Sequence, residues 1–187
     1  TPVRMPDKRN RTLRLAYEKA AENIRSLSFR KKNPYKYISA FNILIKHELF
    51  DQIKFNENCT LYGYEDALLG IELKIRKKEI YHIDNPLLHT GIDTNEEYLE
   101  KIKDSLTTLY TIGNTMQNES SICKIQKLIT KVKLNTPIDI LFTHIFKKRF
   151  EKNLLSTSPS LSILQLYKIG YYCHICQTNE KKRKNIR

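Results

Sequence analysis

Two adjacent carboxylates, Glu65 and Asp66, follow a glycine and a tyrosine and precede an apolar run in the stretch LYGYEDALLG at residues 61–70. Acidic residues in the first turn of a helix are favoured by its free backbone N–H groups and by the helix dipole. A carboxylate at a helix start that opens onto a pocket can also hold a substrate hydroxyl and accept its proton. The pair therefore has two interpretations, a helix start and a catalytic site, and the rest of the chain must decide between them.

Three further positions carry polar chemistry. Asn42 lies inside the apolar run YKYISAFNILI at 35–45, where an amide needs hydrogen-bond partners, so it either holds a neighbouring loop or contacts a ligand. His89 follows the turn sequence DNP at 84–86 and is either a metal ligand or a core or surface histidine. The CHIC sequence at 173–176 has no second pair of ligands at zinc-site spacing, which favours a packed helix face over a zinc site.

The 187 residues suffice for one domain, or for a smaller domain with a helical appendage. The net charge limits the classes of partner to consider. A net charge of +13 favours nucleic acid, an anionic membrane surface or a phosphorylated substrate. The basic excess lies at the two ends of the chain and leaves an acidic centre around the Glu-Asp pair.

The cysteines and the hydropathy indicate a compartment. Four cysteines in a chain that begins without a signal peptide are typical of a reducing environment, so we expect free thiols and a cytoplasmic protein. No apolar run approaches the roughly 20 residues that span a bilayer. Membrane contact would then be peripheral, at the inner face of the membrane, through the basic tail EKKRKNIR and the helix before it.

The spacing of apolar residues predicts a change of character near residue 94. Before it we expect helices at 12–25 and 66–77, a helical turn at 46–50, a buried strand at 35–45, a short strand at 79–83 and an extended piece at 87–89. After it the spacing is helical throughout, with helices at 95–112, 121–134, 135–150 and 161–176. The chain is thus divided into an α/β part, residues 1–93, and a helical extension with a basic tail, residues 94–187.

The strand with Asn42, the helix start GYED at 63–66 and the segment DNPLLH at 84–89 resemble, in order and spacing, the C-terminal half of a family 2 glycosyltransferase with the GT-A fold. The resemblance implies that residues 1–93 are the acceptor-side part of a GT-A catalytic domain. It also implies transfer of a sugar from a nucleotide-diphosphate sugar to a saccharide or lipid-linked saccharide acceptor, in the synthesis of cell-surface polysaccharide or glycoconjugate.

The same resemblance assigns roles to residues. Asp66 would be the base that takes the proton of the acceptor hydroxyl, and Glu65 would orient the acceptor. Asn42, Gly63 and Tyr64 would contact the acceptor, Gly63 by letting the backbone approach the sugar closely. His89 would bind a divalent metal, Mn²⁺ or Mg²⁺, whose other ligands lie in the nucleotide-binding half of such enzymes.

Members of that family hold the metal and the diphosphate with an acidic D-x-D strand, and no D-x-D occurs among these residues. We therefore expect a fragment of a longer enzyme, without transferase activity by itself and without nucleic acid as a partner. Two rivals remain. A nucleic-acid-binding protein would account for the charge and the 11 tyrosines, and a non-catalytic helical adaptor would form a homo-oligomer through the helices at 137–176.

Overall fold

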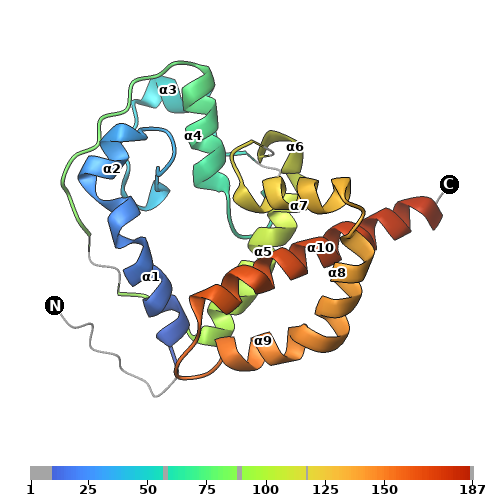
Figure 1. Ribbon diagram of the computed structural model, residues 1–187. Coiled ribbons are helices and arrows are strands. Elements are labelled where there is room, and N and C mark those ends of the chain that lie inside the picture. The colour runs from blue at the N-terminus through green and yellow to red at the C-terminus, as the bar shows by residue number, and fades with distance from the viewer. Residues whose placement is uncertain (1–9, 57–58, 88–89, 117, 186–187) are drawn as a thin grey trace.

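The computed structural model describes residues 10–56, 59–87, 90–116 and 118–185, and all regular structure in these ranges is helical (Figure 1). The predicted α/β fold, with half of a GT-A domain over residues 1–93, is therefore wrong. The helices are α1 (Thr12–Arg25), α2 (Leu27–Lys32), η1 (Ala40–Asn42), α3 (His47–Gln52), α4 (Glu65–Ile75), α5 (Asn95–Thr111), α6 (Gly113–Met116), α7 (Ser121–Lys131), α8 (Asn135–Leu141), the π-helical turn η2 (Phe142–Phe146), α9 (Lys147–Leu154) and α10 (Leu161–Asn185).

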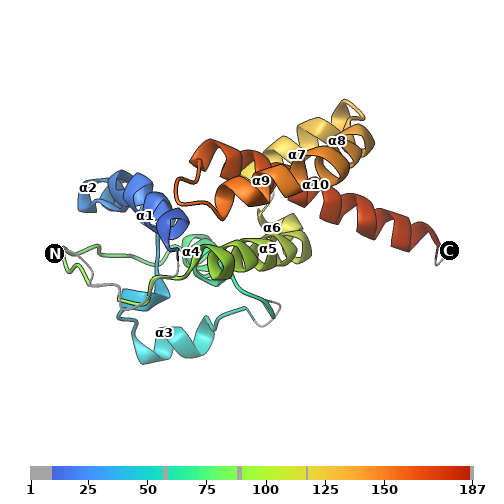
Figure 2. The ribbon, with the colours of Figure 1, turned by 90° about the horizontal axis from the view of Figure 1, so that it is seen from below.

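The main hydrophobic core forms where α10 crosses α5. Leu106 and Leu109 of α5 pack with Leu164 and Tyr167 of α10, and all four side chains are almost completely buried. Figure 2 shows α5 on one side of α10 and helices α7 and α8 on the other. Leu13 of α1 belongs to the same core, so buried residues from both sides of the predicted boundary at 93 and 94 pack together.

A buried asparagine fixes the start of two helices. The Asn95 side chain is fully buried; its Oδ1 accepts a hydrogen bond from the Leu13 N–H at 2.8 Å, and its Nδ2 donates to the Ser156 carbonyl at 3.0 Å. Thr94 and Glu97 form a reciprocal capping box at the same helix end. The first turns of α1 and α5 are therefore held together by polar contacts inside the core.

Both predicted strands are wrong. Residues 35–45 contain η1 with extended backbone on either side, and Phe41 and Leu44 are exposed. The chain at 79–83 has no regular structure, and Tyr81 and Ile83 are exposed. A strand needs a neighbour whose N–H and C=O groups complete the ladder, and the described residues contain no such neighbour.

The helical predictions hold. Helix α1 spans the predicted 12–25, and the second half of the described chain is helical as expected. Helix α10 runs farther than predicted, and its apolar residues pack against several helices, so it does not present one free apolar side. Within the described ranges, every helix is too short or too polar to cross a membrane.

Candidate functional site: a carboxylate pair beside a basic hollow

A sharp turn precedes α4 and sets the direction of the carboxylate pair. Gly63 and Tyr64 both have positive φ angles, 106° and 73°, which are costly for a residue with a side chain such as Tyr64. A Cβ at Gly63 would lie 2.7 Å from the Ser105 Cβ on α5. The glycine is thus required by backbone geometry and by packing on α5, and its predicted contact with an acceptor remains a prediction.

The two carboxylates make different contacts in the first turn of α4. Glu65 Oε1 accepts a hydrogen bond from the Gly63 N–H at 3.1 Å, which closes the turn. Asp66 Oδ1 accepts one from the Ala40 N–H, also at 3.1 Å, and so joins η1 to α4. Burial raises the pKa of Asp66 above the usual carboxyl value and nearby Glu65 adds to this, whereas the hydrogen bond from Ala40 opposes it.

The predicted acceptor-binding residues are placed differently from one another. Tyr64 packs against the main core, and burial raises its pKa to about 12, with Cys123 close enough to add to the shift. Asn42 is exposed, and its Nδ2 donates a hydrogen bond to the Asn85 carbonyl at 2.8 Å. Of the two roles predicted for Asn42, the structure shows the one in which its side chain holds a neighbouring loop. His89 lies outside the described residues.

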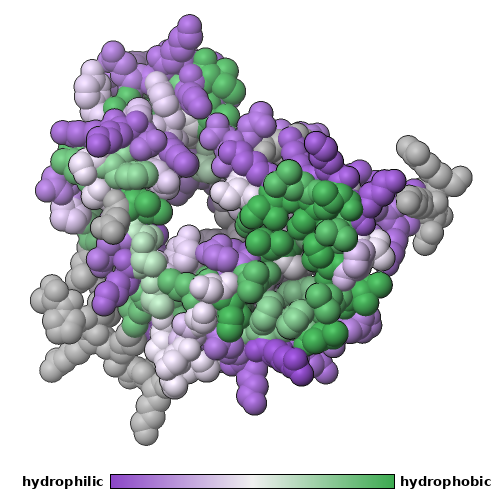
Figure 3. All heavy atoms as spheres, in the orientation of Figure 1, coloured by the Kyte–Doolittle hydropathy of each residue, from purple (hydrophilic) through white to green (hydrophobic). Residues whose placement is uncertain are grey.

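A broad hollow lies between α1, α2, α4 and the segments 36–46 and 77–87, and Asp66 is part of its lining. Figure 3 shows the molecule opened at its centre, between the part formed by α1 to α4 and the part formed by α5 to α10. The hollow holds about 2170 Å³, well above the roughly 300 to 1,000 Å³ of a closed small-molecule pocket. It is an open basin that could admit a large polar ligand.

The lining of the hollow has a positive excess. It includes four acidic residues, Glu18, Asp66, Glu79 and Asp93, and eight basic ones, Arg14, Arg25, Arg30, Lys36, Lys46, Lys77, Lys78 and Lys101. Glu18 pairs with both Arg14 and Arg25 on α1. The remaining basic side chains give the hollow a positive potential that favours anions.

Sequence reasoning missed a second group in the hollow. Lys101 of α5 pairs with Asp93 at 2.7 Å, and its Nζ lies 5.4 Å from the centre of the Tyr62 ring. Tyr62 is exposed and lines the hollow with Asp66. Its place directly before the GYED sequence was a usable signal, whereas nothing local connects Asp93 and Lys101 to that stretch.

The described residues do not make a metal site. They contain no group of three or more His, Cys, Asp and Glu side chains placed to hold an ion, and both carboxylates of the pair are engaged by backbone N–H groups. The divalent metal therefore remains a prediction.

The cysteines are free thiols, as predicted. Cys173 donates a hydrogen bond to Gln126 Oε1 at 2.8 Å, and burial raises the pKa of Cys173 to about 11 and that of Cys176 to about 12. The two thiols thus stay protonated inside a packed helix face.

Comparisons with protein-family models, with curated proteins and with solved structures find no match to this chain. The residues of the hollow are therefore the basis for assigning a function to the chain.

Proposed function

We propose that this chain forms the acceptor side of a sugar-transfer enzyme, with Asp66 as the base. One observation carries the proposal: Asp66, at the start of α4, lines the central hollow together with the exposed ring of Tyr62. An aromatic face packs against a sugar ring, and a carboxylate accepts hydrogen bonds from sugar hydroxyls. The proposal concerns this site alone and needs no sheet in residues 1–93.

The chemistry follows from the contacts of the two carboxylates. Because Asp66 Oδ1 accepts the Ala40 N–H, Oδ2 takes the proton of the acceptor hydroxyl as that oxygen bonds to the anomeric carbon. The bond between the anomeric carbon and the diphosphate breaks, and the diphosphate leaves with the bonding electrons. A pKa raised by burial makes Asp66 a stronger base than an exposed carboxylate. Glu65 acts as a positioning residue, because it closes the turn at Gly63.

The excess of basic over acidic side chains in the hollow supports the step in which the diphosphate departs. A departing diphosphate gains negative charge, and fixed cations stabilise that charge most where water is partly excluded. Lys46 and Lys78 line the hollow from the segments 36–46 and 77–87, which precede and follow α4 in the chain. They are the groups that we assign to this role.

The proposal is tested by saccharide binding, which does not require a complete donor site. The full chain is screened on a saccharide array, and each hit is titrated by ligand-observed NMR. Asp66→Asn and Tyr62→Ala are expected to weaken binding about tenfold or more, since a hydrogen bond to a charged group contributes about 1.5 to 3 kcal/mol. Asp51→Asn on α3 removes the same charge outside the hollow and should leave the affinity unchanged.

Two results would overturn the proposal. One is an array on which no saccharide binds. The other is binding of duplex or single-stranded nucleic acid that falls steeply with salt and is insensitive to Asp66→Asn, which would favour the nucleic-acid-binding rival.

A further inference from the structure

Helix α7 leaves part of its apolar side exposed at its C-terminal end. Its buried Cys123 and its Gln126 face α10, where Gln126 Oε1 accepts the hydrogen bond from Cys173. With about 3.6 residues per turn, the opposite side of the helix carries Leu128 and then Val132 at its end. These side chains are 63% and 59% exposed. An amphipathic helix at the surface of a protein normally buries that side.

The connection to α8 and the turn after it continue this surface. Asp139 and Phe142 face the core, whereas Leu134, Leu141 and Ile145 are exposed. Leu134 directly precedes α8, Leu141 is its last residue and Ile145 lies in the π-helical turn η2. Figure 3 shows hydrophobic side chains gathered over α7 and α8, and Figure 2 shows both helices on the same side of α10. We call Leu128, Val132, Leu134, Leu141 and Ile145 the α7–α8 apolar face.

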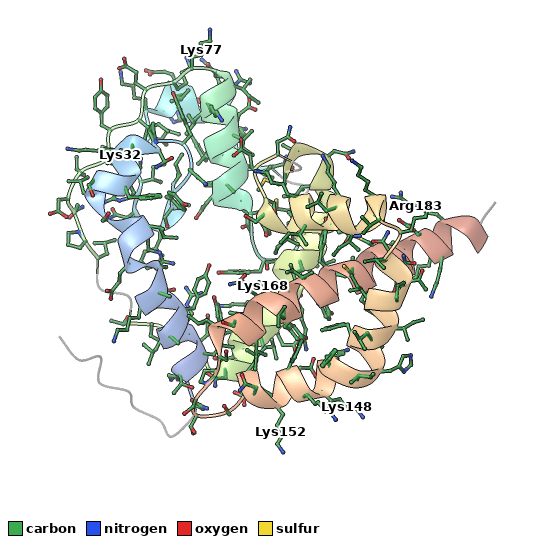
Figure 4. The ribbon with its side chains drawn as sticks, in the orientation of Figure 1. Lys32, Lys77, Lys148, Lys152, Lys168 and Arg183 are labelled. Atoms are coloured by element: carbon green, nitrogen blue, oxygen red, sulfur yellow. The ribbon has the colours of Figure 1, made fainter. Side chains whose placement is uncertain are left out.

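The charges around this face have one sign. From 121 to 149 the chain holds one acidic residue, Asp139, and seven basic ones, Lys124, Lys127, Lys131, Lys133, Lys147, Lys148 and Arg149. Asp139 is buried and lies 2.7 Å from the His174 Nδ1. Figure 4 shows Lys148 and Lys152 reaching outward from α9. The exposed charge beside the apolar face is therefore positive.

We propose that the α7–α8 apolar face docks on a bilayer that contains anionic phospholipid. The apolar side chains would enter the boundary between headgroups and acyl chains, and the flanking lysines would extend along it to reach lipid phosphates. A second copy of this chain is the less suitable occupant, because two such faces would bring lysines against lysines. The proposal is independent of sugar transfer and moves the membrane contact away from α10, most of whose apolar residues pack in the core.

A single-tryptophan reporter tests the docking surface directly, because the chain has no tryptophan of its own. Leu128→Trp places the reporter on the face, and Ile75→Trp places it on α4 at a site of similar exposure, 68%. With vesicles of phosphatidylcholine and phosphatidylglycerol, emission from Leu128→Trp should shift to the blue and be quenched by brominated lipid. Emission from Ile75→Trp should not change, and vesicles of phosphatidylcholine alone should bind far more weakly.

The contribution of the lysines is measured by vesicle flotation. Replacing Lys127 and Lys131 with glutamine should lower the partition coefficient about fivefold for each lysine. The same change at Lys19 and Lys54, which lie outside the face, lowers the net charge equally and should have a smaller effect.

Three outcomes would overturn the proposal. The first is no binding that depends on phosphatidylglycerol, and the second is a blue shift at position 75 without one at position 128. The third is a dimer that forms in the absence of lipid, dissociates in the double variant Leu128→Ser/Val132→Ser, and binds no vesicles.

Discussion

The Gly70→Ala substitution probes the contact that places the Ala40 N–H against Asp66. Gly70 lies inside α4, and a Cβ there would fall well within contact distance of the Tyr35 carbonyl oxygen and 3.4 Å from the Ile38 Cδ1. The oxygen belongs to the backbone, so no side-chain rotation can relieve the clash. The segment from Tyr35 to Ala40 must move away from α4 as a unit.

The magnitude follows from two opposing effects. Overfilling a packed contact costs about 1 to 3 kcal/mol, and alanine is about 1 kcal/mol better than glycine inside a helix. The moving segment also carries Tyr35 and Ile38, which cover the small cluster of Ile53, Leu69 and Leu73. We therefore expect a net loss of about 1 to 2 kcal/mol in the free energy of unfolding, which is roughly 2 to 8 °C in Tm for a chain of this size.

Urea unfolding measures the loss of stability, and amide hydrogen exchange measures the displacement of the segment from α4. The unfolding midpoint should fall, and the Ala40 amide should exchange faster because its acceptor on Asp66 is displaced. Gly113→Ala is the matched control: its Cβ would meet only the Tyr172 Oη at an ordinary 3.5 Å, so its stability should be unchanged or higher. Equal stability of the two variants, with unchanged exchange at Ala40, would refute the packing argument.

Two further predictions concern the core and the site. Asn95→Ala leaves the buried Leu13 N–H without its acceptor, and should lower the free energy of unfolding by about 2 to 4 kcal/mol in urea titrations; a loss no larger than that of Asn179→Ala on the outer part of α10 would contradict this. Because the folded pKa of Asp66 is raised above its unfolded value of about 3.9, its contribution to stability is present below about pH 4 and is lost as pH rises through the folded pKa. Asp66→Asn should therefore gain stability relative to the parent chain as the pH rises above the unfolded value of about 3.9, and a difference that does not vary with pH would contradict the shift.

The helices were predictable because their determinants are local. The apolar spacing of α1 and α5 lies within single segments of the sequence, and the Thr94 and Glu97 capping box is visible three residues apart. The end of α10 was predicted too early, because its last turns are polar and its apolar residues do not follow one stripe.

The strand predictions failed because a strand is defined by its neighbour. The run 35–45 has the β-branched and aromatic residues of a buried strand, and 79–83 has the length of one. Composition describes what a strand prefers, yet pairing depends on a second segment in register. The described residues supply no such segment, so 35–45 forms the short turn η1, 79–83 has no regular structure, and both segments line the hollow.

The site was predictable only in part. The place of Glu65 and Asp66 at a helix start follows from the sequence, and the structure has it. Asp66 contacts Ala40, which lies 26 residues earlier in the chain. Lys101 approaches Tyr62, which lies 39 residues earlier. Such contacts depend on how α4 packs between η1 and α5, which no local pattern encodes.

The crossing of α5 and α10 has a consequence for how the chain is made. Helix α5 buries its apolar stripe against α10, and the ribosome must synthesise α6 to α9 before α10 exists. Until then Leu106 and Leu109 have no permanent cover, although α5 itself can already be helical. The core therefore closes only after α10 has been synthesised, and a chain stalled before Leu161 would expose the surface that chaperones recognise.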